Sequence, residues 1–148
     1  SRWRWLAVHT AVVAVATAAL LAAGSLAFAA TVSVSLDDPG QLGRLTAAGL
    51  WQLPAVAVFP ALSVALFGAL PRLQVLAWLP FALAVVVTMM GPTLQLTPDQ
   101  IRSSPFSLVG DAPGGAVGVA GVVGLCAAAA VLVAAGLAAF RRRDVPTG

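Results

Sequence analysis

Four long stretches of the chain carry no charged side chain, and they constrain the fold more than any other feature of the sequence. A bilayer core about 30 Å thick is crossed by roughly 20 apolar helical residues, and a charge at its centre costs about 2.5–3.5 kcal/mol. Charge-free stretches of this length therefore predict membrane-spanning helices. The expected hydrocarbon portions are residues 6–30, 49–70, 73–95 and 116–140.

The composition excludes a soluble protein. Of the 148 residues, 60% are hydrophobic and 9% are charged, against roughly 45–50% and about 25% in soluble domains. We therefore predict an all-α, polytopic membrane helix bundle forming a single transmembrane domain over residues 1–148. Ala27-Phe28-Ala29 also fits a signal-peptide cleavage site. However, the apolar stretch around it is longer than the roughly 7–15 residues of a signal-peptide core, so we expect a membrane helix.

The arginines predict how the bundle is oriented. All eight basic residues are arginines, and with a cytoplasmic N-terminus six of them lie on the inner side, as the positive-inside tendency requires. The inner arginines are Arg2, Arg4, Arg72, Arg141, Arg142 and Arg143, and the outer ones are Arg44 and Arg102. We therefore expect both termini in the cytoplasm. We also expect Arg72 and the Arg141, Arg142, Arg143 cluster to anchor the chain to anionic lipid.

The segment between the third and fourth stretches, residues 91–113, is predicted to hold short helices at the outer surface. Thr97 can cap a helix with Pro98 at its first position, and Ser104-Pro105 ends that helix. Several apolar side chains in the segment favour amphipathic or re-entrant helices over the alternative, a plain loop. We hypothesise an outer gate here, formed by Pro98, Ile101, Pro105 and Phe106.

Inside the spans, large apolar side chains are candidates for a substrate pathway. The candidates are Phe59, Phe67, Met89 and Met90. The alternative is that they face lipid or the core, as such side chains at helical spacing commonly do. Small residues at four-residue spacing predict close helix packing; they are Ala14, Ala18 and Ala22 in the first span and Ala120, Gly124 and Ala128 in the fourth.

Several kinds of chemistry are absent from the sequence. There is no lysine, so no P-loop lysine, and one histidine with one cysteine cannot build a typical zinc or haem site. No charged residue lies within a span, which disfavours an ion-driven carrier. A net charge of +3 indicates membrane topology rather than nucleic acid as the partner. We expect no catalytic, metal or cofactor site in this chain, and hence no enzyme.

Three segments resemble the permease half of bacterial ATP-binding-cassette (ABC) exporters, in particular the actinobacterial exporters of polyketide antibiotics of the tetronasin type. They are LFGALPRLQVLAW at residues 66–78, the outer GPTLQLTP…SPF…APGG, and the terminal AAGLAAFRRRD at residues 134–144. The resemblance implies a half of six helices with an outer re-entrant hairpin between the last two. The four spans would then be its last four, and the chain the C-terminal part of a longer permease in the bacterial inner membrane.

The resemblance also implies partners and a function. A dimeric ABC ATPase would hold ATP and Mg²⁺, and the remaining permease helices or a second permease half would complete the pathway. The expected function is export of hydrophobic small molecules: antibiotics, drugs or lipids. The alternative is a non-transporting four-helix membrane assembly or anchor subunit.

Overall fold

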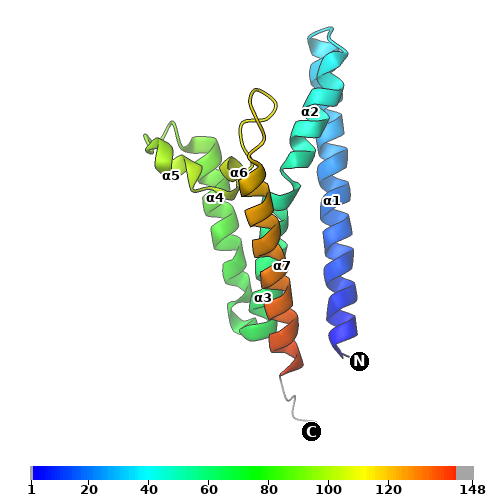
Figure 1. Cartoon of the computed structure of the whole chain (residues 1–148), viewed down its shortest axis with the longest axis vertical. Coiled ribbons are helices and arrows are strands. Elements are labelled where there is room, and N and C mark those ends of the chain that lie inside the picture. Colours follow the sequence, from blue (N-terminus) through cyan, green and yellow to red (C-terminus); the bar gives the residue numbers. More distant parts are fainter. Residues whose placement is uncertain (1, 143–148) are drawn as a thin grey trace.

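The computed structural model describes residues 2–142, with side chains from Arg4 onward, as a bundle of helices (Figure 1). In chain order the elements are α1 (Arg2–Ser35), α2 (Gly40–Trp51), α3 (Leu53–Ala69), the 3₁₀ helix η1 (Pro71–Ala77), α4 (Trp78–Met90), α5 (Pro98–Arg102), α6 (Pro105–Leu108) and α7 (Val119–Arg141). Within these residues four helical stretches are long and apolar enough to cross a membrane: Arg4–Ser35, Gly40–Ala69, Pro71–Met90 and Val119–Arg141. The predicted all-α membrane bundle is confirmed.

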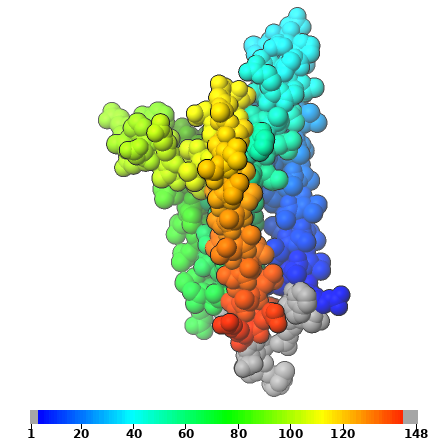
Figure 2. All heavy atoms as spheres, viewed as in Figure 1, coloured from blue at the N-terminus to red at the C-terminus, as the bar shows by residue number. Residues whose placement is uncertain are grey.

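The first two spans are longer as helices than their expected hydrocarbon portions. α1 continues to Ser35 and α2 begins at Gly40, and the tip that they form projects beyond the rest of the bundle (Figure 2). Two aspartates make the turn between them. Asp37 adopts a left-handed φ of 50°, which aspartate tolerates. The Asp38 carboxylate accepts from the Gly40 N–H at 2.9 Å and from the Gln41 side chain at 2.8 Å. These polar contacts place the turn outside the apolar layer.

The second span is interrupted between α2 and α3. Trp51 ends α2, Gln52 joins the two helices, and Pro54 lies in the first turn of α3. Proline has no N–H to continue the hydrogen-bond ladder of the preceding helix, so a break here costs little. The side-chain oxygen Oε1 of Gln52 is buried, and among the described residues it has no hydrogen-bond partner. The interruption lets the span change neighbours: α2 packs along α1, whereas α3 packs along α7.

The third span combines two kinds of helix. α4 alone, at about 1.5 Å per residue, is too short to cross a bilayer core, and η1 adds roughly 2.0 Å per residue at its start. The helix ends at Met90, earlier than the expected residue 95, because Pro92 cannot donate to the helix that precedes it. A turn over residues 91–95 then leads to the outer segment.

The two short helices predicted in the outer segment are present. Thr97 caps α5: its hydroxyl accepts from the Gln100 N–H, and the Gln100 side chain accepts from the Thr97 N–H at 2.8 Å. Pro98 is the first residue of this helix, as expected, and Pro105 starts α6 after Ser104. We call residues 98–108 the outer hairpin. It extends sideways from the end of α4 (Figures 1 and 2).

Glycines bring the backbones of α3 and α7 into close contact. A Cβ on Gly68 would meet the backbone carbonyl of Gly136, and a Cβ on Gly136 would lie 2.6 Å from the Val64 carbonyl oxygen. Small residues let helix backbones approach in this way in lipid. The contact does not involve the small residues predicted for this helix, because Ala120, Gly124 and Ala128 are all exposed and Gly124 has open space around it.

The close contact between α1 and α2 is made at Ser25 and Gly49, whereas the small residues predicted on α1 are buried only in part. Ala18 and Ala22 are half-buried, whereas Ala14 is exposed. One to two turns further on, a Cβ on Gly49 of α2 would collide with the Ser25 side chain of α1. The bundle therefore contains two closely packed helix pairs, α1 with α2 and α3 with α7, and η1 and α4 lie beside α3.

Ser104 fastens the outer hairpin to α4. Its side chain is 3% exposed. The Ser104 hydroxyl lies 2.8 Å from the Thr88 hydroxyl and 3.5 Å from the Ala84 carbonyl oxygen, both on α4. A second attachment is apolar, since Phe106 packs against the small core of Ala55, Val109 and Leu125. The hairpin is therefore held over both α3 and α4.

Replacing Gly136 by alanine should destabilise the bundle, because the new methyl group meets backbone atoms of α3 that cannot turn aside. Overpacking of this kind typically costs about 1–3 kcal/mol. Gly124→Ala, on the same helix, should cause no loss, because its side chain enters open space and alanine favours helix. Thermal unfolding of the detergent-solubilised protein measures both. Equal effects of the two substitutions would contradict the assigned packing face.

Ser104→Ala should loosen the outer hairpin without unfolding the bundle. Removing one buried hydrogen-bond network costs about 0.5–1.5 kcal/mol, so amide hydrogen exchange over residues 98–108 should become about 2–10 times faster. Ser103→Ala is the matched control, because the exposed Ser103 hydroxyl bonds only within its own turn, to the Gln100 carbonyl. If both variants exchange at the same rate, Ser104 does not fasten the hairpin.

Candidate functional site

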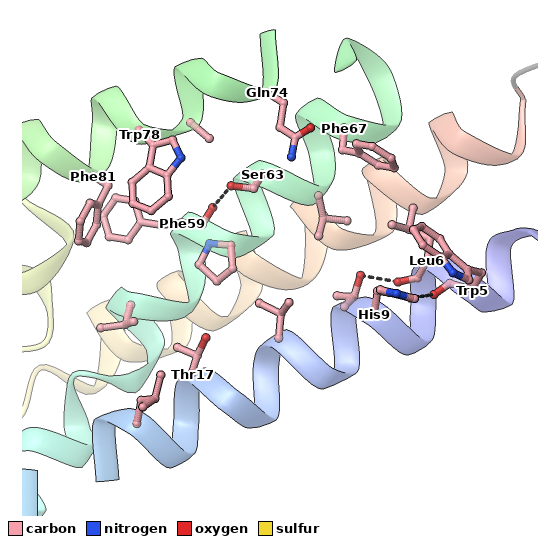
Figure 3. A pocket seen from close by; sticks show the side chains of 17 residues that line it. Trp5, Leu6, His9, Thr17, Phe59, Ser63, Phe67, Gln74, Trp78 and Phe81 are labelled. Atoms are coloured by element: carbon pink, nitrogen blue, oxygen red, sulfur yellow. Dashed lines mark hydrogen bonds between the residues drawn. The ribbon is translucent and has the colours of Figure 1, made fainter. Parts of the chain in front are cut away.

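An apolar groove of about 730 Å³ runs between α1 on one side and α3, η1 and α4 on the other. Figure 3 shows the side chains of the 17 residues that line it. They are Trp5, Leu6, His9, Thr10, Val13, Thr17 and Leu20 from α1; Val56, Phe59, Pro60, Ser63, Val64 and Phe67 from α3; and Gln74, Ala77, Trp78 and Phe81 from η1 and α4. The groove lies where the two helix pairs of the bundle face each other.

The α1 wall follows from helical periodicity. Its lining residues recur every three or four positions, which places them along one face of the helix. Trp5 and His9 start this face, with their ring centroids 3.9 Å apart. Thr17 and Leu20 end it, three to four turns further along. At about 1.5 Å per residue the face is roughly 20 Å long.

Aromatic side chains dominate the opposite wall. The Phe59 ring meets the Phe81 ring edge-on, with centroids 5.1 Å apart, and Phe81 in turn lies 6.0 Å from Trp78. Phe59 also contacts Phe106 of the outer hairpin, at 5.8 Å. These rings offer a large apolar surface with preferred edge-to-face and offset geometries. Phe59 therefore belongs both to the groove and to the support of the outer hairpin.

Polar groups of the groove gather toward the end where α1 begins. The Thr10 hydroxyl donates to the Leu6 carbonyl at 2.8 Å, and the Ser63 hydroxyl donates to the Phe59 carbonyl at 3.2 Å. His9 is hydrogen-bonded through Nδ1 to the Trp5 carbonyl oxygen. Gln74 faces them from η1 (Figure 3). None of the described residues that line the groove is charged, so the groove suits ligands without a net charge.

The predicted pathway residues separate into two groups. Phe59 and Phe67 line the groove, and Phe67 also stacks on Phe140 of α7, with centroids 5.8 Å apart. Met89 and Met90 lie at the C-terminal end of α4, where they are 75% and 48% exposed and do not line the groove. Position along the span separates them: Ala77, Trp78 and Phe81 line the groove near the start of the third span, whereas Met89 and Met90 lie about two to three turns further along α4.

The predicted gate residues do lie together in the outer hairpin. Pro98 and Ile101 belong to α5, and Pro105 and Phe106 to α6. A Cβ on Gly91, at the end of α4, would touch the Ile101 side chain at 2.9 Å. Ile101 therefore packs over the end of α4, while Phe106 packs toward Phe59 of α3. The two halves of the hairpin rest on different spans.

The predicted lipid anchors lie at the opposite end of the bundle from the outer hairpin. Arg72 is exposed in the first turn of η1, and Arg141 and Arg142 are exposed at the end of α7 (Figure 1). Arg143 lies outside the described residues. The α1 residues His9 and Thr17 and the η1 residue Gln74 were not predicted as site residues. The recurrence of Trp5, His9, Val13 and Thr17 on one helical face was the signal in the sequence for this wall.

Within the described residues there is no group of three or more histidine, cysteine or carboxylate side chains that could hold a metal ion. The chemistry that the groove offers is therefore apolar contact and a few uncharged hydrogen-bonding groups.

Comparison with known proteins gives the family. Residues 1–141 match the family described as the C-terminal domain of the multidrug efflux system permease Rv1217c. The chain is also 34% identical, over 149 aligned residues, to the multidrug efflux system permease protein Rv1217c of Mycobacterium tuberculosis (strain ATCC 25618 / H37Rv). That alignment covers 98% of this chain and 27% of the relative, so the chain spans about a quarter of the length of the curated relative that it matches. The chain thus belongs to the family of C-terminal domains of multidrug efflux system permeases.

Proposed function

We propose that this chain is a transmembrane part of an ABC exporter permease that moves hydrophobic small molecules, such as antibiotics, drugs or lipids, out of a bacterial cell. The observation that carries the proposal is the uncharged, aromatic groove of about 730 Å³. Its volume falls within the roughly 300–1,000 Å³ of pockets for drug-sized ligands, which are mostly apolar with a few polar groups. The family membership supports efflux as the direction.

Energy for transport would come from a partner. The sequence has no lysine and hence no P-loop, so ATP and Mg²⁺ would be bound by a separate ATPase dimer. The relative's greater length supports further permease helices, or a second permease half, completing the pathway around the groove. The resemblance of residues 66–78, of the outer segment and of residues 134–144 to tetronasin-type exporters supports a polyketide antibiotic as one substrate.

The outer hairpin would close the outer end of the pathway. It rests on α4 through Ser104 and on α3 through Phe106, and Phe106 meets the groove residue Phe59. A shift of the hairpin would therefore displace the aromatic side chains of the groove wall. Pro98, Ile101, Pro105 and Phe106 form the gate in this proposal.

Substitution of Trp78 by alanine tests the pathway, because Trp78 lines the groove yet is 69% exposed, so that its loss leaves the core intact. The full-length permease should co-purify with an ATPase whose activity hydrophobic drugs stimulate, and Trp78→Ala should reduce that stimulation several-fold. Met89→Ala is the control, since Met89 is a large exposed side chain outside the groove.

A larger loss with Met89→Ala than with Trp78→Ala would move the pathway to the outer end of α4. Purification without any ATPase would instead favour the non-transporting assembly or anchor subunit.

Cysteine labelling tests the proposed orientation with both termini in the cytoplasm. In a Cys126→Ala background, which removes the exposed native thiol, Gly114→Cys in the loop before α7 should react with a membrane-impermeant maleimide on intact cells. Arg72→Cys, at the other end of the bundle, should react only after the cells are opened. The reverse pattern would invert the topology.

A further inference from the structure

We propose that the end of the groove nearest the start of α1 is a hydrogen-bonding subsite formed by His9 and Gln74. It selects amphipathic substrates with an uncharged head that carries a hydrogen-bond donor, and the aromatic wall holds their apolar body. The inference rests on the proposed function, since it takes the groove to be the substrate pathway, and it adds the chemical class and the orientation of the substrate.

His9 presents a hydrogen-bond acceptor to the groove. Its Nδ1 lies 2.8 Å from the Trp5 carbonyl oxygen. A carbonyl oxygen only accepts, so Nδ1 must donate, and in a neutral imidazole this leaves Nε2 as an acceptor. The Trp5 ring lies against the imidazole, with centroids 3.9 Å apart, and helps to fix its plane. An acceptor held in this way is complementary to a hydroxyl or amide N–H group of a ligand.

Gln74 supplies both a donor and an acceptor from the facing wall. It lies in η1, and its side chain points toward the groove near Ser63 and Phe67 (Figure 3). Among the described residues no group is hydrogen-bonded to the Gln74 amide. A ligand head between α1 and η1 could therefore bond to Gln74 and to His9 without displacing any bond within the bundle.

The other polar side chains of the groove are less available. The hydroxyls of Thr10 and Ser63 already donate to carbonyls of their own helices. Thr17 lies two turns beyond His9, about 12 Å along α1, among apolar lining residues, and offers a single hydroxyl. Among the described lining residues, an unpaired acceptor on α1 and an unpaired amide on the facing wall occur at a similar height only at His9 and Gln74 (Figure 3). The head is therefore placed there rather than at the Thr17 end.

The chemistry of the groove also limits the charge and the length of the ligand. No described lining residue is charged, so a fully ionised head would be desolvated without a counter-ion, which is strongly unfavourable. Between His9 and Leu20 the α1 wall extends about 16 Å at 1.5 Å per residue. Phe59, Trp78 and Phe81 stand opposite this length. A ligand with a neutral head and a polycyclic or alkyl body of that length therefore matches the polar end and the apolar end of the groove.

A pair of pyrene ligands tests the subsite, because they share an apolar body and differ only in the donor. 1-Pyrenemethanol has a hydroxyl donor, whereas its methyl ether has none. Binding to the full-length permease with its ATPase in lipid nanodiscs is followed by energy transfer from tryptophan to pyrene. Comparing variants for one ligand at a time cancels partitioning into the lipid. The variants are His9→Leu, Gln74→Leu, the double variant, and Thr31→Val as a control on α1 outside the groove, where the hydroxyl bonds only to the Ala27 carbonyl.

The double variant should bind 1-pyrenemethanol about fivefold to tenfold more weakly, as expected for losing buried hydrogen bonds. His9→Leu alone should weaken 1-pyrenemethanol but leave the methyl ether within about twofold of the unsubstituted protein, because the ether has no donor for Nε2 of His9, and this result shows that the groove is intact. Thr31→Val should leave the affinity for both ligands within twofold.

Three outcomes would overturn the proposal. Unchanged affinity for 1-pyrenemethanol in the double variant would contradict the subsite. If drugs still stimulated the ATPase, the proposed function would stand. If neither ligand binds although drugs stimulate the ATPase, other helices of the permease fill the groove. Labelling of a cysteine in the groove checks this: a Cys126→Ala, Val13→Cys protein would then fail to react with a lipid-soluble maleimide. Absence of both binding and stimulation would remove the proposed function together with the subsite.

Discussion

The close contact between α3 and α7 determines how the rest of the bundle is arranged. Gly68 and Gly136 allow the two backbones to touch, and in lipid such packing replaces the hydrophobic drive that holds soluble helices together. Because α3 gives one face to α7, a different face is left for the aromatic side chains of the groove. The small core of Ala55, Val109 and Leu125 forms beside the same pair and supports the outer hairpin.

The groove exists because the two helix pairs do not pack against each other along their whole length. α1 belongs with α2 and α3 with α7, so the second span has to pass from one pair to the other. The Gln52 junction makes that passage. Between the pairs, the side chains of Phe59, Trp78 and Val13 leave room that they do not fill. Polar groups are few and uncharged there, as a cavity open to hydrocarbon requires.

Features that depend on neighbouring residues could be predicted from the sequence. The four spans could be predicted because the cost of inserting a helix into the membrane depends on its own charged residues. The start of α5 at Thr97 and Pro98 could be predicted because helix capping depends on adjacent residues. Features that depend on helix rotation could not. α7 is rich in alanine and glycine, and nothing local distinguishes Gly136, which packs, from Gly124, which does not. Met89 resembled Phe59 as a lining candidate because the sequence does not show which length of α4 faces the groove. The α1 wall did have a local signal, the recurrence of Trp5, His9, Val13 and Thr17 on one helical face.

The interruption at Gln52 has a mechanical consequence. α3 is 17 residues long, or about 26 Å at 1.5 Å per residue, and because it packs along α7, a bend at the junction would move the two helices together. A bend of about 10° at the junction would carry the far end of α3, with its Phe67 ring, about 4 Å toward or away from Trp5. That travel is close to half the spacing of two packed helices. The junction at Gln52 thus controls the width of the groove between its two walls.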